Sequence, residues 1–95
     1  MSVVTLSQWI GGEPRAPSSG ETLEDKNPAT DEVIAQIPRG DGRDVQAAVE
    51  AAQAALAGPW GRTSSGERAD LLDRVADAIE ARLDAWAALE SQDTG

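Results

Sequence analysis

The sequence contains neither cysteine nor histidine. The absence of cysteine excludes disulfides, thiolate metal sites and a thiol nucleophile. The absence of histidine removes the side chain that serves most often as a general base or a metal ligand. Because Lys26 is the single lysine, an activated serine–lysine pair is not expected either. The chain therefore lacks the common nucleophile sets, and the carboxylate pairs Asp73/Asp77 and Glu80/Asp84, which could bind metal or share a proton, are expected to form a solvated acidic helix face.

Large apolar side chains are also scarce. The chain has no phenylalanine and no tyrosine, and 17 of its 38 apolar residues are alanine. Burial of a valine, leucine or isoleucine side chain contributes about 1.5–3 kcal/mol, and alanine contributes far less. A chain of 95 residues also has a high ratio of surface to volume. We therefore expect only a small margin of stability if these residues fold alone.

The charge balance and the apolar pattern restrict the kinds of partner. A formal net charge of −9 argues against nucleic acid or an anionic membrane as a partner. The first residues lack the basic start and long apolar run of a signal peptide. No apolar stretch approaches the roughly 20 residues that span a bilayer. We predict a cytoplasmic protein without a nucleic-acid or membrane partner.

Residues 1–40 have the pattern of two short β-hairpins. Residues 8–10 and 13–16 flank Gly11-Gly12, and glycine tolerates the positive φ of a tight hairpin turn. This glycine pair joins strands and does not open a helix, so it is not a dinucleotide-binding loop. Residues 21–26 and 32–37 form the second predicted pair around a turn at residues 27–31, where Pro28 and Asn27 favour the turn.

Residues 41–95 have the pattern of two helices. Asp41 is a predicted N-cap, and Gly58-Pro59 ends the first helix. Ser64 and Glu67 have capping-box spacing, which predicts a second helix from there to about residue 91, with Gly95 as its stop. Each helix has one apolar face. The two stripes are Val45, Ala48, Val49, Ala52 and Leu56, then Leu72, Val75, Ile79, Leu83 and Trp86.

The short connection between the helices predicts that they form an antiparallel pair. The predicted fold class is therefore α+β, with a β-hairpin region at residues 1–40 followed by a helical hairpin at residues 41–95. We also expect the second stripe to leave apolar surface exposed, which favours self-association or partial folding.

Six segments, in order, resemble the N-terminal part of the aldehyde dehydrogenase family. Residues 27–35 read NPATDEVIA, similar to the family's NPATGEVIA, with Asp31 where glycine is usual. Residues 89–95 read LESQDTG, similar to the start of the family's LE..DTGKP. The remaining matches are residues 9–13, 44–52, 58–60 and 67–72. Each match alone is weak, but the set follows the family's order and spacing over nearly the whole chain.

This resemblance implies an enzyme that oxidises an aldehyde to a carboxylic acid with NAD or NADP. In the family, the cofactor fold, the catalytic cysteine, the glutamate base and the oligomerisation strand all belong to later segments. The chain is thus expected to be an N-terminal fragment without a complete domain and inactive alone. Its expected partners are the rest of the enzyme chain and, in the full enzyme, the aldehyde substrate. The full enzyme is expected to be a homo-oligomer. The segments at residues 24–28, 56–62 and 92–95 favour the branch acting on muconic semialdehydes, with betaine-aldehyde and aliphatic branches as alternatives.

The resemblance also implies a possible monovalent cation site. Many family members bind such an ion through backbone carbonyls just before the NP turn and through the aspartate of the DTGKP motif. The matching positions are Asp25, Lys26 and Asp93. Oxygen donors suit a hard cation, but the ammonium of Lys26 would oppose the ion unless it points away. An ordinary helix-end role is the alternative for Asp93.

A second kind of function remains open at this point. The chain is alternatively a stand-alone, non-enzymatic helical-hairpin module, left by gene truncation, that binds a partner through its apolar stripe. The coding DNA beyond Gly95 distinguishes the two hypotheses. Codons for Lys-Pro and a long continuation support the fragment, whereas an immediate stop supports the module.

Overall fold

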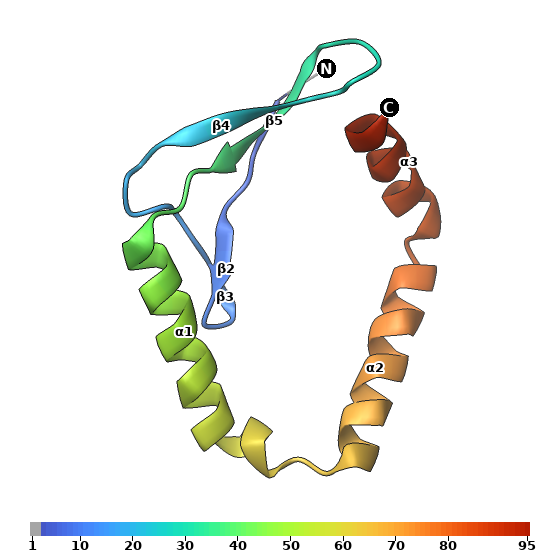
Figure 1. The fold of residues 1–95 in the computed structure, drawn as a ribbon. Coiled ribbons are helices and arrows are strands. Elements are labelled where there is room, and N and C mark those ends of the chain that lie inside the picture. The colour runs from blue at the N-terminus through green and yellow to red at the C-terminus, as the bar shows by residue number, and fades with distance from the viewer. Residues whose placement is uncertain (1–2) are drawn as a thin grey trace.

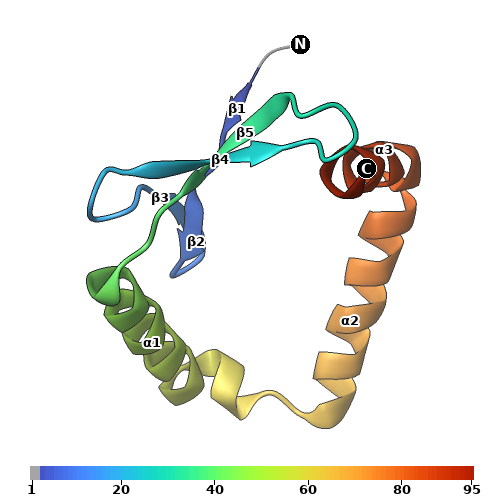
Figure 2. The same cartoon turned by 45° about the horizontal axis from the view of Figure 1, so that its top comes forward.

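The computed structural model describes residues 3–95, which form an open ring (Figures 1 and 2). Five strands occupy one side of the ring and helices complete it. The molecule extends 47 × 35 × 17 Å, and its radius of gyration is 16.8 Å. A compact chain of this length has a radius of gyration of about 12 Å. The elements are therefore spread around an opening and do not pack into one globule.

A three-stranded sheet has the order β1–β5–β4. Strands β4 (Thr22–Lys26) and β5 (Val33–Pro38) form the predicted antiparallel hairpin. We did not predict β1 (Val4–Thr5), which pairs in parallel with β5. The sheet is therefore more than two hairpins. A strand of two residues is too short to show the alternation of apolar and polar side chains by which strands are recognised. Its pairing also depends on a partner about 30 residues away in the sequence.

The first hairpin and both predicted turns are confirmed. Strands β2 (Gln8–Ile10) and β3 (Glu13–Arg15) pair as a separate two-stranded sheet. Both Gly11 and Gly12 have positive φ, 66° and 80°, as a type I′ turn requires. At the other turn, the Asn27 side chain accepts a hydrogen bond from the backbone N–H of Ala29 at 2.9 Å. Asp31 adopts φ 62°, a conformation that glycine tolerates best.

Helix α1 (Gly42–Ala57) begins and ends where the sequence predicts, and a buried carboxylate anchors its start. Asp44 is 4% exposed. It accepts hydrogen bonds from the backbone N–H of Asp41 at 2.9 Å, from the Ser18 hydroxyl at 2.8 Å and from the Gln8 amide at 3.2 Å. One side chain thus joins strand β2, the loop after β3 and the first turn of α1. The sequence analysis assigned no tertiary contact to Asp44.

The prediction of an antiparallel helix pair is wrong. A 3₁₀ turn, η1 (Pro59–Arg62), separates α1 from α2 (Ser65–Glu80). Helix α1 contacts η1 and β2, whereas α2 lies across the opening of the ring (Figure 1). The turn redirects the chain outward, and the alanine-rich face of α1 offers little area that would draw α2 against it.

The second predicted helix is also interrupted, because α3 (Leu83–Thr94) begins after a break. The capping box of α2 is confirmed, since Ser64 and Glu67 bond reciprocally. At Arg82 the backbone leaves the helical region, with φ −125° and ψ 25°. Neither proline nor glycine lies at this break, so no local signal marks it. The change in direction brings the far end of α3 to the turn between β4 and β5 (Figure 2).

Little of the molecule is buried. In residues 3–95, the buried side chains are those of Ala35 and Asp44. Leu72, Val75 and Ile79 are 68%, 47% and 40% exposed, so the apolar stripe of α2 faces no partner within the described chain. Nor does any helix in that part of the chain have the length and apolar character needed to cross a bilayer.

Candidate functional site

A groove of about 760 Å³ separates the three-stranded sheet from α3. Residues of β1, β5 and the end of β4, with Leu6, provide one wall, and α3 from Trp86 to Asp93 provides the other. The lining is mostly apolar, and Asp25 and Asp93 are among its few charged residues. The apolar lining residues are Val4, Leu6, Ile34, Ala35, Ile37, Trp86 and Leu89.

Two of the three positions predicted to hold a cation, Asp25 and Asp93, meet at this groove, although the prediction gave Asp25 a role through its backbone carbonyl and not through its carboxylate. Asp25 is half-buried on β4, and Asp93 is exposed in the last turn of α3. Their side chains are hydrogen-bonded to each other, and this bond raises the pKa of Asp25, with desolvation and the negative charge of Asp93 acting in the same direction. A direct bond between two carboxyl groups needs a shared proton, because two adjacent negative charges repel. The pair thus forms an acidic, oxygen-rich point at the edge of an apolar groove.

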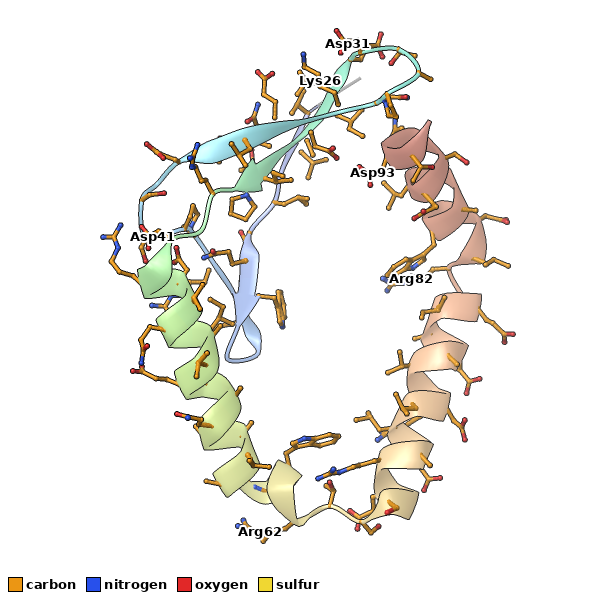
Figure 3. The ribbon with its side chains drawn as sticks, in the orientation of Figure 1. Lys26, Asp31, Asp41, Arg62, Arg82 and Asp93 are labelled. Atoms are coloured by element: carbon orange, nitrogen blue, oxygen red, sulfur yellow. The ribbon has the colours of Figure 1, made fainter. Side chains whose placement is uncertain are left out.

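Lys26 does not place its ammonium between these carboxylates. Its Nζ lies 3.7 Å from a carboxylate oxygen of Asp31, at the tip of the β4–β5 hairpin. Figure 3 shows both side chains there, away from the Asp93 end of α3. The Lys26 ammonium is directed toward Asp31 and away from Asp93. It would therefore repel a cation bound near Asp25 and Asp93 less strongly than an ammonium placed between them.

Gly95, after the end of α3, lies close to the turn between β4 and β5. Gly95 has φ 84°, and a Cβ at this position would lie 3.0 Å from the Cγ of Pro28. The backbone N–H of Gly95 donates to the carbonyl of Ser91 at 2.9 Å. Because Gly95 has no side chain, the end of α3 can lie close to the turn at Pro28. Asp93, on the same helix end, thereby lies near Asp25.

The arrangement can supply oxygen ligands but not a complete metal site. Within residues 3–95, no three side chains of the types His, Cys, Asp or Glu are grouped so as to hold a metal ion. Carboxylates and carbonyls prefer hard cations, which need about six or more oxygen ligands when the ion is as large as Ca²⁺. Asp25 and Asp93 therefore amount to part of a coordination shell.

Phosphate recognition does not fit the two longest helices. The N-terminus of α1 is closed by its own capping box of Asp41 and Asp44, and that of α2 by Ser64 and Glu67. Phosphate binding at a helix start uses free backbone N–H groups and a favourable positive field. Here carboxylates already occupy these positions. The residues present therefore do not fit the pyrophosphate of a dinucleotide.

Sequence reasoning missed the groove itself and one structural feature outside it. It did not predict the groove, because the walls of the groove depend on the parallel pairing of β1 and on the break at Arg82. Neither feature has a local signal in the sequence. It also missed the anchoring role of Asp44, whose partners are 26 and 36 residues away. The only available signal was the D-x-x-D spacing of Asp41 and Asp44.

Sequence comparisons place the chain among known enzymes. The model of the "Aldehyde dehydrogenase family" matches residues 15–95. The 2-hydroxymuconic semialdehyde dehydrogenase of Pseudomonas sp. (strain CF600) is 48% identical over 90 residues, which are 95% of this chain and 18% of that protein. Acetaldehyde dehydrogenase 2 of Cupriavidus necator is 46% identical over 87 residues, which are 92% of this chain and 17% of that protein.

Solved structures agree with this placement. A putative aldehyde dehydrogenase from Burkholderia cenocepacia has a TM-score of 0.91 at 37% identity, covering 94% of this chain and 19% of that one. The NAD+ complex of an aldehyde dehydrogenase from Bacillus cereus has a TM-score of 0.91 at 38% identity, covering 96% and 19%. The chain spans less than a fifth of the length of these relatives. Because the family model covers most of the chain, this protein belongs to the aldehyde dehydrogenase family.

Proposed function

We propose that this chain is the N-terminal region of an enzyme that oxidises an aldehyde to a carboxylic acid with NAD+ or NADP+. The family match over residues 15–95, together with the agreement in fold, carries this proposal. The described residues hold no nucleophile and no base for the reaction. When bound elsewhere in the enzyme, the nicotinamide supplies the hydride acceptor. The contribution of this region is structural.

The exposed stripe of α2 and the groove beside α3 support that structural role. Both present apolar side chains to solvent, which a stable monomer rarely does over a large patch. In the proposed enzyme, the later segments of the chain cover these surfaces. The same reasoning makes residues 1–95 inactive on their own, because catalysis needs groups that these residues do not include.

We expect residues 1–95 to show no binding of NAD+ or NADP+ and no dehydrogenase activity. The helix N-termini that would attract phosphate already hold carboxylates. Isothermal titration calorimetry with each cofactor, up to millimolar concentration, tests this expectation. A full-length aldehyde dehydrogenase serves as the positive control. Stoichiometric binding by residues 1–95 would show that a phosphate site was overlooked.

The substrate class proposed for the whole enzyme is a semialdehyde of the 2-hydroxymuconic type. Two relatives carry that name, at 48% and 43% identity. An acetaldehyde dehydrogenase at 46% identity keeps short aliphatic aldehydes as the alternative. Comparison of kcat/KM for the two aldehydes, in an enzyme that contains this region, decides between them. A preference for acetaldehyde contradicts the proposal.

We further propose that Asp25, Lys26 and Asp93 hold part of a monovalent cation site. The Asp25–Asp93 pair supports this proposal, because a cation between the carboxylates would replace the shared proton. Since the pKa of Asp25 is raised, ionisation of the pair as pH rises through that pKa destabilises the fold unless a cation compensates. The role of the ion would be to join the end of β4 to the end of α3.

Exchange of the salt tests the cation proposal. At neutral pH and equal ionic strength, NaCl or KCl is expected to raise the melting temperature of residues 1–95 by at least about 2 °C over tetramethylammonium chloride. Asp93→Asn is expected to abolish the difference. Asp84→Asn, on the same helix but without a role in the pair, is the matched control and should preserve it. An equal melting temperature in all three salts contradicts the proposal.

A further inference from the structure

The break at Arg82 interrupts a segment whose sequence favours one continuous helix. Residues 80–85 contain neither proline nor glycine, and glutamate, alanine, arginine and leucine, which supply most of them, are good helix formers. The apolar residues Ile79, Leu83 and Trp86 keep the spacing of one helical face across the break. The local sequence therefore does not account for the change of direction between α2 and α3.

The break leaves the start of α3 poorly satisfied. Within residues 3–95 no side chain caps it. Two backbone hydrogen bonds adjoin the break, from the Arg82 N–H to the Ile79 carbonyl at 3.0 Å and from the Trp86 N–H to the Arg82 carbonyl at 3.1 Å. The N–H groups of residues 83–85 have no carbonyl partner in the described chain, so water must satisfy them. A continuous helix would give each of them a carbonyl four residues back.

Few contacts hold α3 in its bent direction, and they lie at its far end (Figure 2). There the side chains of Asp25 and Asp93 are hydrogen-bonded to each other, and a Cβ on Gly95 would lie 3.0 Å from the Cγ of Pro28. We call these two the tip contacts. Between them and the break, the groove of about 760 Å³ separates α3 from the sheet, and Trp86 remains 55% exposed. The apolar side chains of α3 therefore contribute little to holding it in place.

We propose that residues 65–94 form an arm with two states, bent at Arg82 while the tip contacts hold α3 to the sheet and one continuous helix once they are released. Straightening gives residues 83–85 their helix hydrogen bonds and gives up the tip contacts, so the two sets of interactions oppose each other. A ligand or chain segment that binds one state better shifts such an equilibrium. Straightening opens the groove and separates Asp25 from Asp93.

The later segments of the proposed enzyme would lie against both walls of the groove and hold the arm bent. This consequence alone rests on the proposed function. The two-state arm itself is a property of the backbone of residues 65–94 and of the tip contacts. Its test needs neither a cofactor nor the later segments, so its failure and the failure of the catalytic proposal are distinguishable.

Backbone NMR of residues 1–95, with amide hydrogen exchange, distinguishes the two states. In the parent, the amides of residues 83–85 are expected to exchange as unprotected groups, and the Cα shift of Arg82 should not be helical. Asp93→Ala with Gly95→Trp removes both tip contacts. In this released variant, exchange at residues 83–85 should slow at least about 10-fold, and the Cα shift of residue 82 should become helical.

Asp77→Ala with Ala88→Trp is the matched control, because it makes similar replacements on the same arm at positions that do not line the groove. It should keep the exchange rates of the parent. Unprotected amides at residues 83–85 in the released variant would show that the break is intrinsic and overturn the proposal. Protection there already in the parent would show that the tip contacts do not impose the break, and would overturn it equally.

Leu83→Pro separates straightening from unfolding of the arm. Proline is tolerated at the first position of a helix, which residue 83 occupies in α3, but not inside a helix. Leu83→Ala removes the same side chain and keeps the N–H. In the released variant, proline is expected to cancel the slower exchange at residues 84 and 85, whereas alanine should preserve it. Equal rates in the two, or loss of protection along residues 86–92 in the released variant, would overturn the proposal.

Discussion

Replacing Asp44 with alanine is expected to lower the melting temperature of the chain by roughly 5–15 °C at fixed protein concentration. The buried carboxylate accepts hydrogen bonds from the Asp41 backbone, the Ser18 backbone and hydroxyl, and the Gln8 amide. Alanine would leave these donors without their acceptor in a partly buried place, which costs free energy. Strand β2, the loop after β3 and the start of α1 would lose their common attachment.

The position of the residues that lose protection distinguishes loss of the Asp44 hydrogen bonds from a general loss of helix. Amide hydrogen exchange should accelerate at Ser18 and Asp41, whose backbone N–H groups donate to Asp44. Asp73→Ala is the matched control, because Asp73 is an exposed carboxylate within α2. It should leave the melting temperature nearly unchanged. Equal effects of the two substitutions would show that Asp44 has no special role in joining these elements.

Low pH is expected to weaken the hydrogen bonds that the Asp44 carboxylate accepts. The pKa of Asp44 is held well below its usual range, first by the backbone N–H of Asp41, then by the Gln8 and Ser18 donors, against the opposing effect of burial. Because the folded-state pKa is lower than the unfolded value of about 3.9, the ionised carboxylate stabilises the fold above that pH. This stabilisation is lost as pH falls below about 4. Asp44→Asn should flatten the acid limb of the stability profile.

Gly61→Ala is expected to destabilise the chain by about 2–4 kcal/mol. A Cβ on residue 61 would lie 1.7 Å from the carbonyl oxygen of Leu56 and 2.8 Å from its carbonyl carbon. Both atoms belong to the backbone, so they cannot move aside by a change of rotamer. The 3₁₀ turn η1 would have to open, and the hydrogen bond from the Gly61 N–H to the Gly58 carbonyl, 3.1 Å long, would be lost.

Gly66→Ala is a control that is expected to change the free energy of unfolding in the opposite direction. Gly66 lies in the first turn of α2, and the nearest atom to a Cβ there is the Ser64 hydroxyl at 3.9 Å. Alanine is a better helix former than glycine by about 0.5–1 kcal/mol, so this variant should be more stable than the parent. Thermal unfolding followed by circular dichroism compares the two. A Gly61→Ala chain as stable as the parent would show that the turn relaxes without cost.

Local features of the fold were predictable because their causes are local. The Gly11-Gly12 turn needs only two residues that tolerate positive φ, and both glycines adopt it. The start of α2 needs only Ser64 and Glu67, whose reciprocal bonds form within four residues. The end of α1 at Gly58 is of the same kind. Each of these elements satisfies its own backbone groups, so no distant partner is required.

The proximity of two residues of the candidate site was predictable, whereas cation binding there stays a prediction. The family resemblance led to Asp25 and Asp93, and the structure brings their side chains together. It did not reveal that the Lys26 ammonium turns to Asp31, nor the apolar groove beside the carboxylates. Side-chain direction at the end of β4 depends on the strand register, where a β-bulge falls between Asp25 and Lys26.

The sequence by itself determined the two hairpins with their turns, the start and end of α1, the start of α2, the family to which the chain belongs, and the absence of cysteine and histidine from its chemistry. Only the tertiary structure decided the parallel pairing of β1 with β5, the break at Arg82 and the separation of α1 from α2. The physical reason is the range of the interactions. Capping and turn preferences act over a few residues, whereas the ring depends on contacts between residues far apart. The apolar face of α2 has no partner within residues 3–95 that would make such a contact recognisable.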